Sequence, residues 1–430
     1  MKITLNREDI VNQYPPFNVT NTKEVVDLFA KEQIHLYVHL PFCKKKCDYC
    51  YYKSFDTFSN EIVEDYLAAL KREIDTYSQM PVVQSKRIKS LYFGGGTPTL
   101  LSCRQLEELA KYIFEKFDFI DDFEFCVEAN PDEQYLLPEK LHLLKQMNVK
   151  RISFGVQNFN DEILRLNGRE VTAETFYKVY DRARKARFEI INIDIMSGMI
   201  GETWENWRNI ISRLIQLEPE SVAFYKMKLY YNTKLFKKIK KGEQAGNLMS
   251  NSEEMAMVGY AYDRLQDERG YIASNCFSLV RDIAFEHVHA KGILQGEDML
   301  GCGLAAHSCF NKFLYQNTWD MKEYRQVAKQ GRIPVKRAHS ISAKEEISSA
   351  MVYGIRGLSI DRKHFIDQFG VDMMLPYGSI INELVKEGLL ILDDEALRVP
   401  RKYYIFADDI CRRFFLPEYE TMMLAHLLRE

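Results

Sequence analysis

The feature that most constrains the fold is a regular alternation of short β-rich runs with amphipathic stretches of helical length, between about residues 35 and 230. This alternation is typical of β/α units, in which helices connect neighbouring parallel strands. Strands are expected over residues 35–40, 90–94, 123–129, 151–157, 190–196 and 221–227, and helices over residues 60–79, 104–117, 138–147, 173–186 and 203–217. Six strands in this order predict an α/β fold with a partial (β/α)6 barrel, and an open doubly wound sheet is the alternative.

The alternation fades after residue 230. The basic run of Lys237, Lys238, Lys240 and Lys241 predicts a solvated face. Beyond it, a helix is expected over residues 252–269 and a strand over residues 271–275.

From residue 340 the pattern changes to three helices and a strand-turn-strand hairpin. The helices are expected over residues 343–355, 362–369 and 379–387, and the strands over residues 389–392 and 397–399. This order is typical of a winged-helix-like α+β module. Eleven Lys and Arg face fifteen Asp and Glu in residues 340–430, a balance that opposes binding to DNA phosphates. We therefore expect the module to be structural or to cover the substrate.

The chain is thus expected to have four parts. They are an N-terminal extension (1–34), the barrel domain (35–270), a connecting and substrate-proximal segment (271–339) and the C-terminal module (340–430).

Composition excludes several classes of protein. Of the 430 residues, 46% are hydrophobic and 28% are charged, which are ordinary values for a globular protein. The net charge of −3 provides no general attraction for nucleic acid or an anionic membrane. Because no run resembles a signal peptide or a membrane span, we expect a cytoplasmic protein with a small-molecule substrate.

Three of the nine cysteines, Cys43, Cys47 and Cys50, lie within eight residues directly after the first expected strand. The C-terminal ends of barrel strands are where active sites are built. A tight cysteine group in a reducing compartment more often binds metal than forms disulfides. Three thiolates are one short of the set that holds an ordinary electron-transfer cluster, so one iron would stay open to a small molecule. The lysines at positions 44–46 should favour the thiolate form.

A structural zinc site with His39 as fourth ligand is the alternative for these cysteines. Closed zinc sites usually combine two separated pairs of ligands. The sequence contains no second cysteine pair, which favours the cluster.

Polar residues recur where the next expected strands end. Gly94, Gly95, Gly96 and Thr97 follow the second strand, and glycines let the backbone approach a ligand closely. Further polar residues mark three later strand ends: Glu128, Gln157 and Asp194. A buried carboxylate needs a partner, and recurrence at the same end of successive strands predicts a shared ligand.

The run Tyr37-x-His39-x-Pro41-Phe42-Cys43, continued to Cys47 and Cys50, resembles the signature of radical S-adenosylmethionine (SAM) enzymes. It looks like the HemN/HemW branch of that superfamily, which contains anaerobic coproporphyrinogen dehydrogenase, the haem chaperone and HemN-like C-methyltransferases. The resemblance implies a 4Fe-4S cluster with Cys43, Cys47 and Cys50 as its metal ligands.

The resemblance also implies residues that bind SAM. Gly94, Gly95, Gly96 and Thr97 would contact its methionyl end, Glu128 and Arg169 its amino acid part, and Gln157 and Asp194 its ribose. Tyr37 is the candidate for contacting a second SAM molecule, which a methyltransferase would use.

The activity implied by the resemblance is reductive cleavage of SAM to a 5′-deoxyadenosyl radical. This radical would abstract hydrogen from an organic, tetrapyrrole-like substrate, leading to oxidation or C-methylation. A flavodoxin or ferredoxin would supply the electron.

The sequence departs from two members of the branch. Tyr52 stands where coproporphyrinogen dehydrogenase has a further cysteine, which argues against porphyrinogen decarboxylation. Haem delivery by a chaperone is the alternative function, with His287 and His289 as candidate haem ligands, although we expect both at the surface or in a loop. The run from Gly301 to His307 resembles a family segment that packs near the substrate. The six scattered cysteines are expected to be buried thiols.

Overall fold

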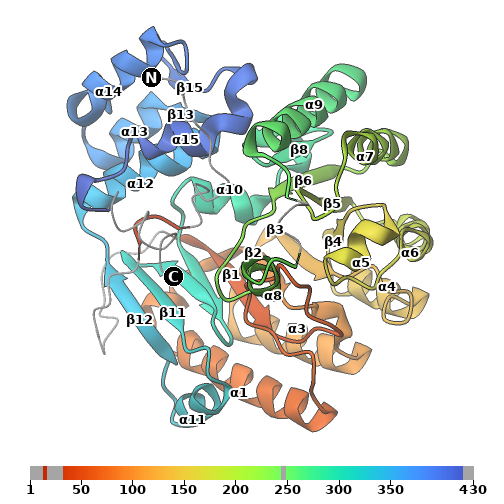
Figure 1. Ribbon diagram of the computed structural model, residues 1–430. Helices are drawn as coiled ribbons and strands as arrows, with labels where there is room; N and C mark the ends of the chain where they lie inside the picture. Colours follow the sequence, from red (N-terminus) through yellow and green to blue (C-terminus); the bar gives the residue numbers. More distant parts are fainter. Residues whose placement is uncertain (1–12, 17–31, 244–247, 420–430) are drawn as a thin grey trace.

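The computed structural model describes residues 13–16, 32–243 and 248–419, and its core is a large, mostly parallel sheet (Figure 1). Within these residues the sheet has twelve strands in the order β12-β11-β10-β9-β1-β2-β3-β4-β5-β6-β8-β7. No helix among the described residues is both long and apolar enough to span a membrane.

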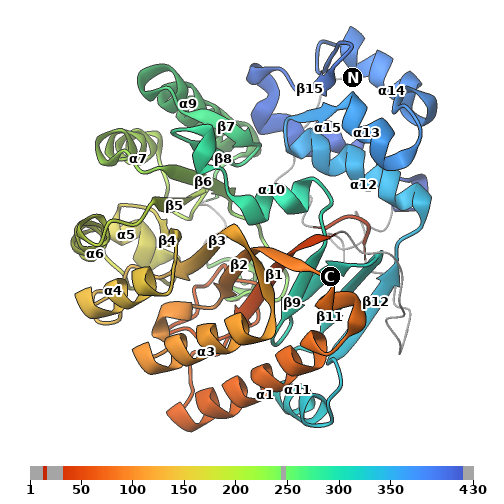
Figure 2. The same cartoon turned by 180° about the vertical axis from the view of Figure 1, so that it is seen from behind.

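The parallel half of the sheet confirms the predicted strand order. Its strands are β1 (Gln33–Leu40), β2 (Arg87–Gly95), β3 (Asp118–Ala129), β4 (Arg151–Gln157), β5 (Ile190–Ser197) and β6 (Ser221–Lys226). The five predicted helices are α1 (Asn60–Ser78), α3 (Cys103–Lys116), α4 (Pro138–Gln146), α6 (Ala173–Lys185) and α7 (Trp204–Leu217). They line the outer side of the curved sheet, as Figure 2 shows from behind. Two short helices, α2 (Pro81–Gln84) and α5 (Asp161–Leu166), were not expected.

The segment 271–339 contributes strands to both edges of the sheet. The strand β7 (Ile272–Asn275), which was predicted, pairs with β8 (Ser278–Val280), and β8 pairs antiparallel with β6. At the other edge, β9 (Met299–Cys302) pairs parallel with β1 and is followed by β10 (His307–Phe310), β11 (Phe313–Asn317) and β12 (Val335–Ser340). Between β6 and β12 the chain also forms the helices α8 (Lys234–Lys240), α9 (Asn251–Arg269), which was predicted, α10 (Val288–Leu294) and α11 (Met321–Lys329).

The two-residue periodicity of the strands separates an apolar face from a polar one. In β1, Leu36 and Val38 are buried in the main core, whereas His35 and His39 alternate with them and point to the opposite face. In β5, Ile193 belongs to the same core, and Asp194 follows it on the other face. The inner, concave face of the sheet is therefore the polar one.

The C-terminal module contains the three predicted helices and the predicted hairpin. They are α12 (Ala343–Arg356), α13 (Arg362–Phe369), α14 (Met374–Lys386), β14 (Ile391–Leu392) and β15 (Ala396–Arg398). The strand β13 (Ser359–Asp361), the 3-10 helix η5 (Arg401–Phe406) and α15 (Ala407–Arg412) were not expected. β13 pairs with β15, which also pairs with β14. Helix α14 begins before the predicted position because Pro376 lies in its first turn, where a missing backbone N–H is tolerated.

The described part of the N-terminal extension packs on this module. Tyr14 belongs to the module's own core, and its hydroxyl lies 2.7 Å from the Ser348 hydroxyl and accepts a 2.8 Å hydrogen bond from the Leu416 backbone. The two ends of the described chain thus meet in one cluster.

Candidate active site

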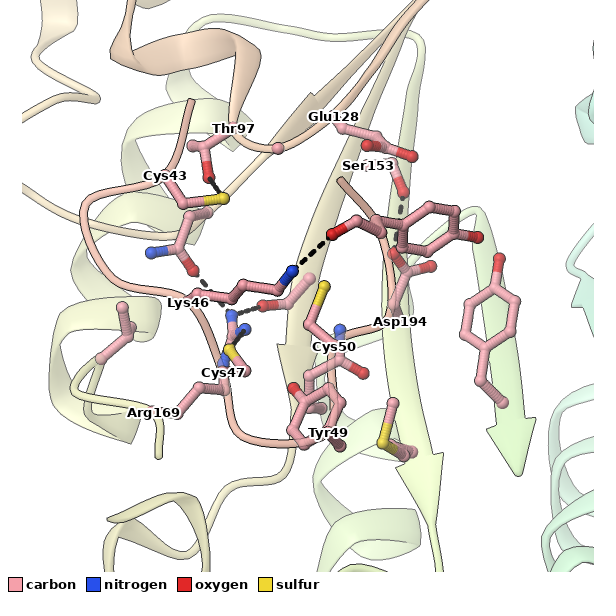
Figure 3. Close-up of a pocket in the computed structure, with 18 of the residues that line it drawn as sticks. Cys43, Lys46, Cys47, Tyr49, Cys50, Thr97, Glu128, Ser153, Arg169 and Asp194 are labelled. Atoms are coloured by element: carbon pink, nitrogen blue, oxygen red, sulfur yellow. Dashed lines mark hydrogen bonds between the residues drawn. The ribbon is translucent and has the colours of Figure 1, made fainter. Parts of the chain in front are cut away.

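A cavity of about 640 Å³ lies at the C-terminal ends of the parallel strands (Figure 3). It is lined by the cysteine loop, the ends of β2 to β6 and parts of the C-terminal module. In Figure 3, Cys43 and Cys47 lie on one side, and Glu128, Ser153 and Asp194 lie on the other. The strand-end residues that the sequence singled out therefore share one site.

The cysteine loop leaves β1 and is held by backbone hydrogen bonds. The Cys43 N–H donates to the Phe55 carbonyl at 2.9 Å, and the Cys50 N–H donates to the Cys47 carbonyl at 3.2 Å. All three thiols are free and half-buried, and all three line the cavity.

Burial is the main influence on these thiols. It raises the pKa of Cys43 and raises the pKa of Cys50 to about 11, while the nearby Lys46 opposes both shifts. Lys44 and Lys45 are instead paired with Asp132 at 3.0 Å and Glu170 at 2.7 Å. Lys46 therefore favours the thiolate form of Cys43 and Cys50, as expected, but burial outweighs its effect. Deprotonation of these thiols requires a stronger positive charge, such as a bound metal.

Two donors point at the thiol sulfurs. The Thr97 hydroxyl donates to Cys43 Sγ at 4.0 Å, and Arg169 Nη1 donates to Cys47 Sγ at 3.4 Å. Such donors stabilise negative charge on sulfur.

The zinc alternative does not fit the geometry. In the described part of the chain, no three His, Cys, Asp or Glu side chains converge on a position that could hold a single metal ion. The ring nitrogens of His39 lie 2.9 Å from the Tyr37 hydroxyl and 3.1 Å from the Lys53 carbonyl, so His39 is not available as a fourth ligand.

The glycine-rich turn after β2 lies directly against the cysteine loop. Gly95 has φ +110°, and a Cβ there would lie 2.5 Å from the His39 ring, while one at Gly96 would lie 2.5 Å from the Phe42 carbonyl. Packing within the protein therefore requires glycine at both positions, whether or not a ligand binds there. Gly95, Gly96 and Thr97 line the cavity, but Gly94 is not among the lining residues and packs against Tyr92 and Tyr37.

The two carboxylates at the strand ends have protein partners. Glu128 accepts hydrogen bonds from the Tyr92 hydroxyl at 2.6 Å and the Gly95 N–H at 3.0 Å. Asp194 accepts from Asn192 at 2.7 Å and Ser153 at 3.3 Å. Burial raises the pKa of Glu128, and burial followed by repulsion from Glu128 raises the pKa of Asp194 to about 7.

Three polar atoms of residues that line the cavity lack hydrogen-bond partners. They are the Tyr49 hydroxyl, Gln157 Oε1 and Arg169 Nε, and Gln157 also has φ +71°. Buried polar atoms are normally paired, so an unpaired one needs an explanation, such as a ligand. The other nitrogens of Arg169 are occupied, because Nη2 donates to Asn130 and to the Gly155 carbonyl.

Tyr37 is not among the residues that line the cavity. Its hydroxyl contacts His39, and its ring lies 5.7 Å from the Tyr92 ring and 6.3 Å from the His289 ring, between centroids.

The expectation that His287 and His289 lie at the surface or in a loop is wrong for His289, which is buried in α10 with its Nδ1 3.0 Å from the Ser90 hydroxyl. It is confirmed for His287, which lies in the loop directly before α10, is half-buried and has its Nε2 3.4 Å from Glu124 Oε1. Burial lowers the pKa of both histidines well below the usual range.

The residues that line the far end of the cavity were not predicted from sequence. There Arg356 Nε donates to Asp408 at 2.8 Å, and Lys226 lies 4.0 Å from the same carboxylate. Cys276, expected to be a buried thiol, is half-buried and lines the cavity. Two cations around one carboxylate leave this end positively charged. No spacing pattern could have found it, because its residues come from three distant segments.

Residues 37–214 match the family model described as the radical SAM superfamily. The chain therefore carries a radical SAM domain, as its cysteine spacing suggested.

The relatives extend this similarity over most of the chain. It is 28% identical over 383 residues to the "Heme chaperone HemW" of Bacillus subtilis (strain 168), covering 88% of this chain and 98% of the relative. It is 27% identical over 419 residues to the "Oxygen-independent coproporphyrinogen III oxidase" of Escherichia coli (strain K12), covering 91% and 87%. The solved structure of coproporphyrinogen III oxidase (HemN) from Escherichia coli matches with a TM-score of 0.76 and 25% identity, covering 90% and 91%. The predicted resemblance to the HemN/HemW-like branch is confirmed by these relatives, and the predicted α/β fold by the match to the HemN structure.

A radical SAM domain implies a 4Fe-4S cluster and SAM, and the residues present fit both. Three free thiols from one loop suit a cluster with one open iron. The unpaired Gln157 Oε1 and Arg169 Nε suit a polar organic ligand beside it.

Proposed function

We propose that this protein is a radical SAM enzyme in which Cys43, Cys47 and Cys50 hold a 4Fe-4S cluster and the adjoining cavity holds SAM. The observation that carries the proposal is the opening of three free thiols into the same cavity as the unpaired Gln157 Oε1. When bound and reduced, the cluster and SAM supply a 5′-deoxyadenosyl radical that takes a hydrogen atom from the substrate.

The chain's own residues bind and orient these groups. Arg169 holds Cys47 and presents its unpaired Nε to the amino acid part of SAM, beside Glu128. Gln157 and Asp194 bind the ribose hydroxyls, which can donate to Gln157 Oε1 and to the carboxylate. Gly95, Gly96 and Thr97 face the methionyl end. A contact between Tyr37 and a second SAM molecule stays a prediction, and the absence of Tyr37 from the cavity lining gives it no support.

The substrate proposed is a large, flat, tetrapyrrole-like molecule that is oxidised or C-methylated. The cavity of about 640 Å³ reaches from the cysteines to the C-terminal module, within the usual size range of small-molecule sites. Tyr51 and Tyr230 line the cavity with ring centroids 4.0 Å apart and ring planes tilted by 33°, which offers aromatic surface to a planar ring. Tyr52 also lines the cavity and is 49% exposed. Since Tyr52 replaces the additional cysteine, decarboxylation is the least supported outcome.

Anaerobic reconstitution followed by iron, sulfide and 5′-deoxyadenosine analysis tests the proposal. The wild type should hold four irons per chain and release 5′-deoxyadenosine from SAM with dithionite. A Cys43→Ala/Cys47→Ala/Cys50→Ala variant should do neither. Retention of four irons by this triple variant, or zinc alone in anaerobically purified wild type, would overturn the assignment.

A haem chaperone is the second candidate function. It is favoured by the relative named as a haem chaperone, of which this chain covers 98%. Because His289 is buried and lies beside Ser90, haem binding through His289 would require α10 to move. Haem titration of the wild type and of His289→Ala distinguishes the two functions. Binding lost in the variant, without 5′-deoxyadenosine from the wild type, would favour the chaperone.

A further inference from the structure

Helix α8 carries an unusual excess of unpaired positive charge. Lys234, Lys237, Lys240 and the following Lys241 are all exposed, and none forms an ion pair with a carboxylate among the described residues. The lysines of the cysteine loop behave differently, because Lys44 and Lys45 are neutralised by acidic neighbours.

The opposite side of α8 packs on the cysteine loop. Leu235 is fully buried, and its N–H donates to the Asp48 carbonyl at 2.8 Å. Leu235 and Tyr49 belong to one apolar cluster, and Cys47 and Ile239 pack against it. Figure 1 shows α8 beside the loop that follows β1. The unpaired lysines therefore form the outer surface next to Cys47.

The helix itself accounts for only part of this charge. Lys237 and Lys240 lie in the last turn of α8, where positive charge is favourable for the helix dipole, but Lys234 lies in the first turn, where it is unfavourable. Lysines three and four positions apart also repel each other, and α8 contains no acidic residue to compensate. Lys238 is the exception, since it pairs with Asp48 at 2.6 Å. The other lysines form a concentrated positive face that an acidic partner would neutralise.

The immediate surroundings resemble a protein interface. Tyr231, which precedes α8, is 61% exposed, and tyrosine is enriched at interfaces. A positive patch on a protein of net charge −3 is a local feature that steers an acidic partner to one place.

We propose that the lysine face of α8 is the docking surface for an acidic one-electron carrier protein that reduces the cluster. This inference rests on the proposed function. In the step, the reduced carrier loses one electron and the cluster gains it, passing from its 2+ to its 1+ state, with no bond formed or broken. Electron-transfer encounters are typically small and transient, as a seven-residue helix and its neighbours would allow.

The test compares two sets of four substitutions. The first is Lys234→Gln/Lys237→Gln/Lys240→Gln/Lys241→Gln. The matched control is Lys322→Gln/Lys329→Gln/Lys363→Gln/Lys386→Gln, four exposed lysines that form no ion pair with any residue the structure describes and do not line the cavity. Lys238 stays unchanged in both because it anchors Asp48. Oxidised flavodoxin, an acidic carrier, is the probe, and its dissociation constant is measured with cofactor-free protein at low and high salt.

The α8 variant should bind flavodoxin about tenfold more weakly at low salt, and the control variant should bind like the wild type, because exposed charges act most strongly at low ionic strength. In reconstituted protein, 5′-deoxyadenosine formation driven by reduced flavodoxin should fall about as much in the α8 variant. Formation driven by dithionite, which needs no docking surface, should stay unchanged.

Equal flavodoxin affinity in both variants would overturn the inference, as would an equal loss of activity with dithionite. Selective loss of RNA binding instead of flavodoxin binding would replace the carrier with a nucleic acid partner. If the wild type forms no 5′-deoxyadenosine with dithionite, the proposed function fails, and the binding measurement still decides whether α8 docks an acidic carrier.

Discussion

Among single residues, Asp194 has conflicting requirements for folding and for binding. Its pKa of about 7 lies above the ordinary value because burial penalises the charged form. The stability that it contributes is therefore present at low pH and lost as pH rises through about 7. We predict that Asp194→Asn increases the free energy of unfolding of the cofactor-free protein at pH 8 by about 1–3 kcal/mol, and by less at pH 5. Urea unfolding at both pH values measures this, and an equal difference at both would contradict it.

Replacing Gln157 should affect the binding of SAM and leave the stability of the fold unchanged. Its Oε1 has no partner, so Gln157→Ala removes no hydrogen bond from that atom. The melting temperature of the cofactor-free protein should stay close to that of the wild type. The affinity of the reconstituted protein for SAM should fall about five- to tenfold, equivalent to about 1–1.4 kcal/mol, the worth of a typical hydrogen bond. Gln84→Ala, at an exposed position outside the cavity, is the control and should change neither.

The residues that could be predicted from sequence share one property. Glu128, Gln157 and Asp194 each lie in the C-terminal half of a parallel strand, so their position alone places them toward one edge of the sheet. Arg356 and Asp408 belong to helices whose docking on the barrel leaves no mark in local spacing. The burial of His289 was missed for a related reason, since a short helix gives no sign of which element will cover it.

At the scale of elements, the Arg356–Asp408 pair connects the end of α12 to α15 at the cavity. Both side chains are nearly buried, with 12% and 10% exposed, so breaking the pair leaves a charge poorly solvated. Arg356→Met and Asp408→Leu should each lower the free energy of unfolding by about 3 kcal/mol. The double variant should lose less than the sum, giving a coupling of about 1–3 kcal/mol.

A double-mutant cycle on the exposed ion pair Arg104–Glu108 is the control for this prediction. Its side chains are 59% and 47% exposed, so solvent screens the pair and its coupling should be much smaller than that of the cavity pair. Similar coupling in both cycles, measured by urea unfolding, would mean that the cavity pair is solvated like a surface pair.

The predictability of the elements also depends on their environment. The strands β1 to β6 were predicted correctly because each has a continuous apolar face and is followed by an amphipathic stretch of helical length. The edge strands β9 to β12 were missed because they are short and carry polar residues, such as His307 and Ser308 in β10. Their pairing depends on the long-range contact between β9 and β1, which no local pattern records.

At the scale of the whole molecule, Tyr14 links the beginning of the described chain to its end. Tyr14→Phe removes the hydroxyl shared by Ser348 and the Leu416 N–H and leaves that N–H buried without its partner. We expect the free energy of unfolding to fall by about 1–3 kcal/mol. Thermal unfolding measures the effect, and Tyr231→Phe, at a 61% exposed position, should leave stability unchanged.

The chain between β8 and β9 crosses the inner face of the sheet near the N-terminal ends of its strands. It is held there because Arg151 donates to the Phe285 carbonyl at 2.7 Å and His289 contacts Ser90. This segment covers that end of the curved sheet and leaves the opening beside the cysteines as the route into the cavity. In the proposed reaction, substrate, methionine and 5′-deoxyadenosine would then enter and leave by the same route. Products would have to dissociate in a fixed order, and the product that leaves last would inhibit the next turnover.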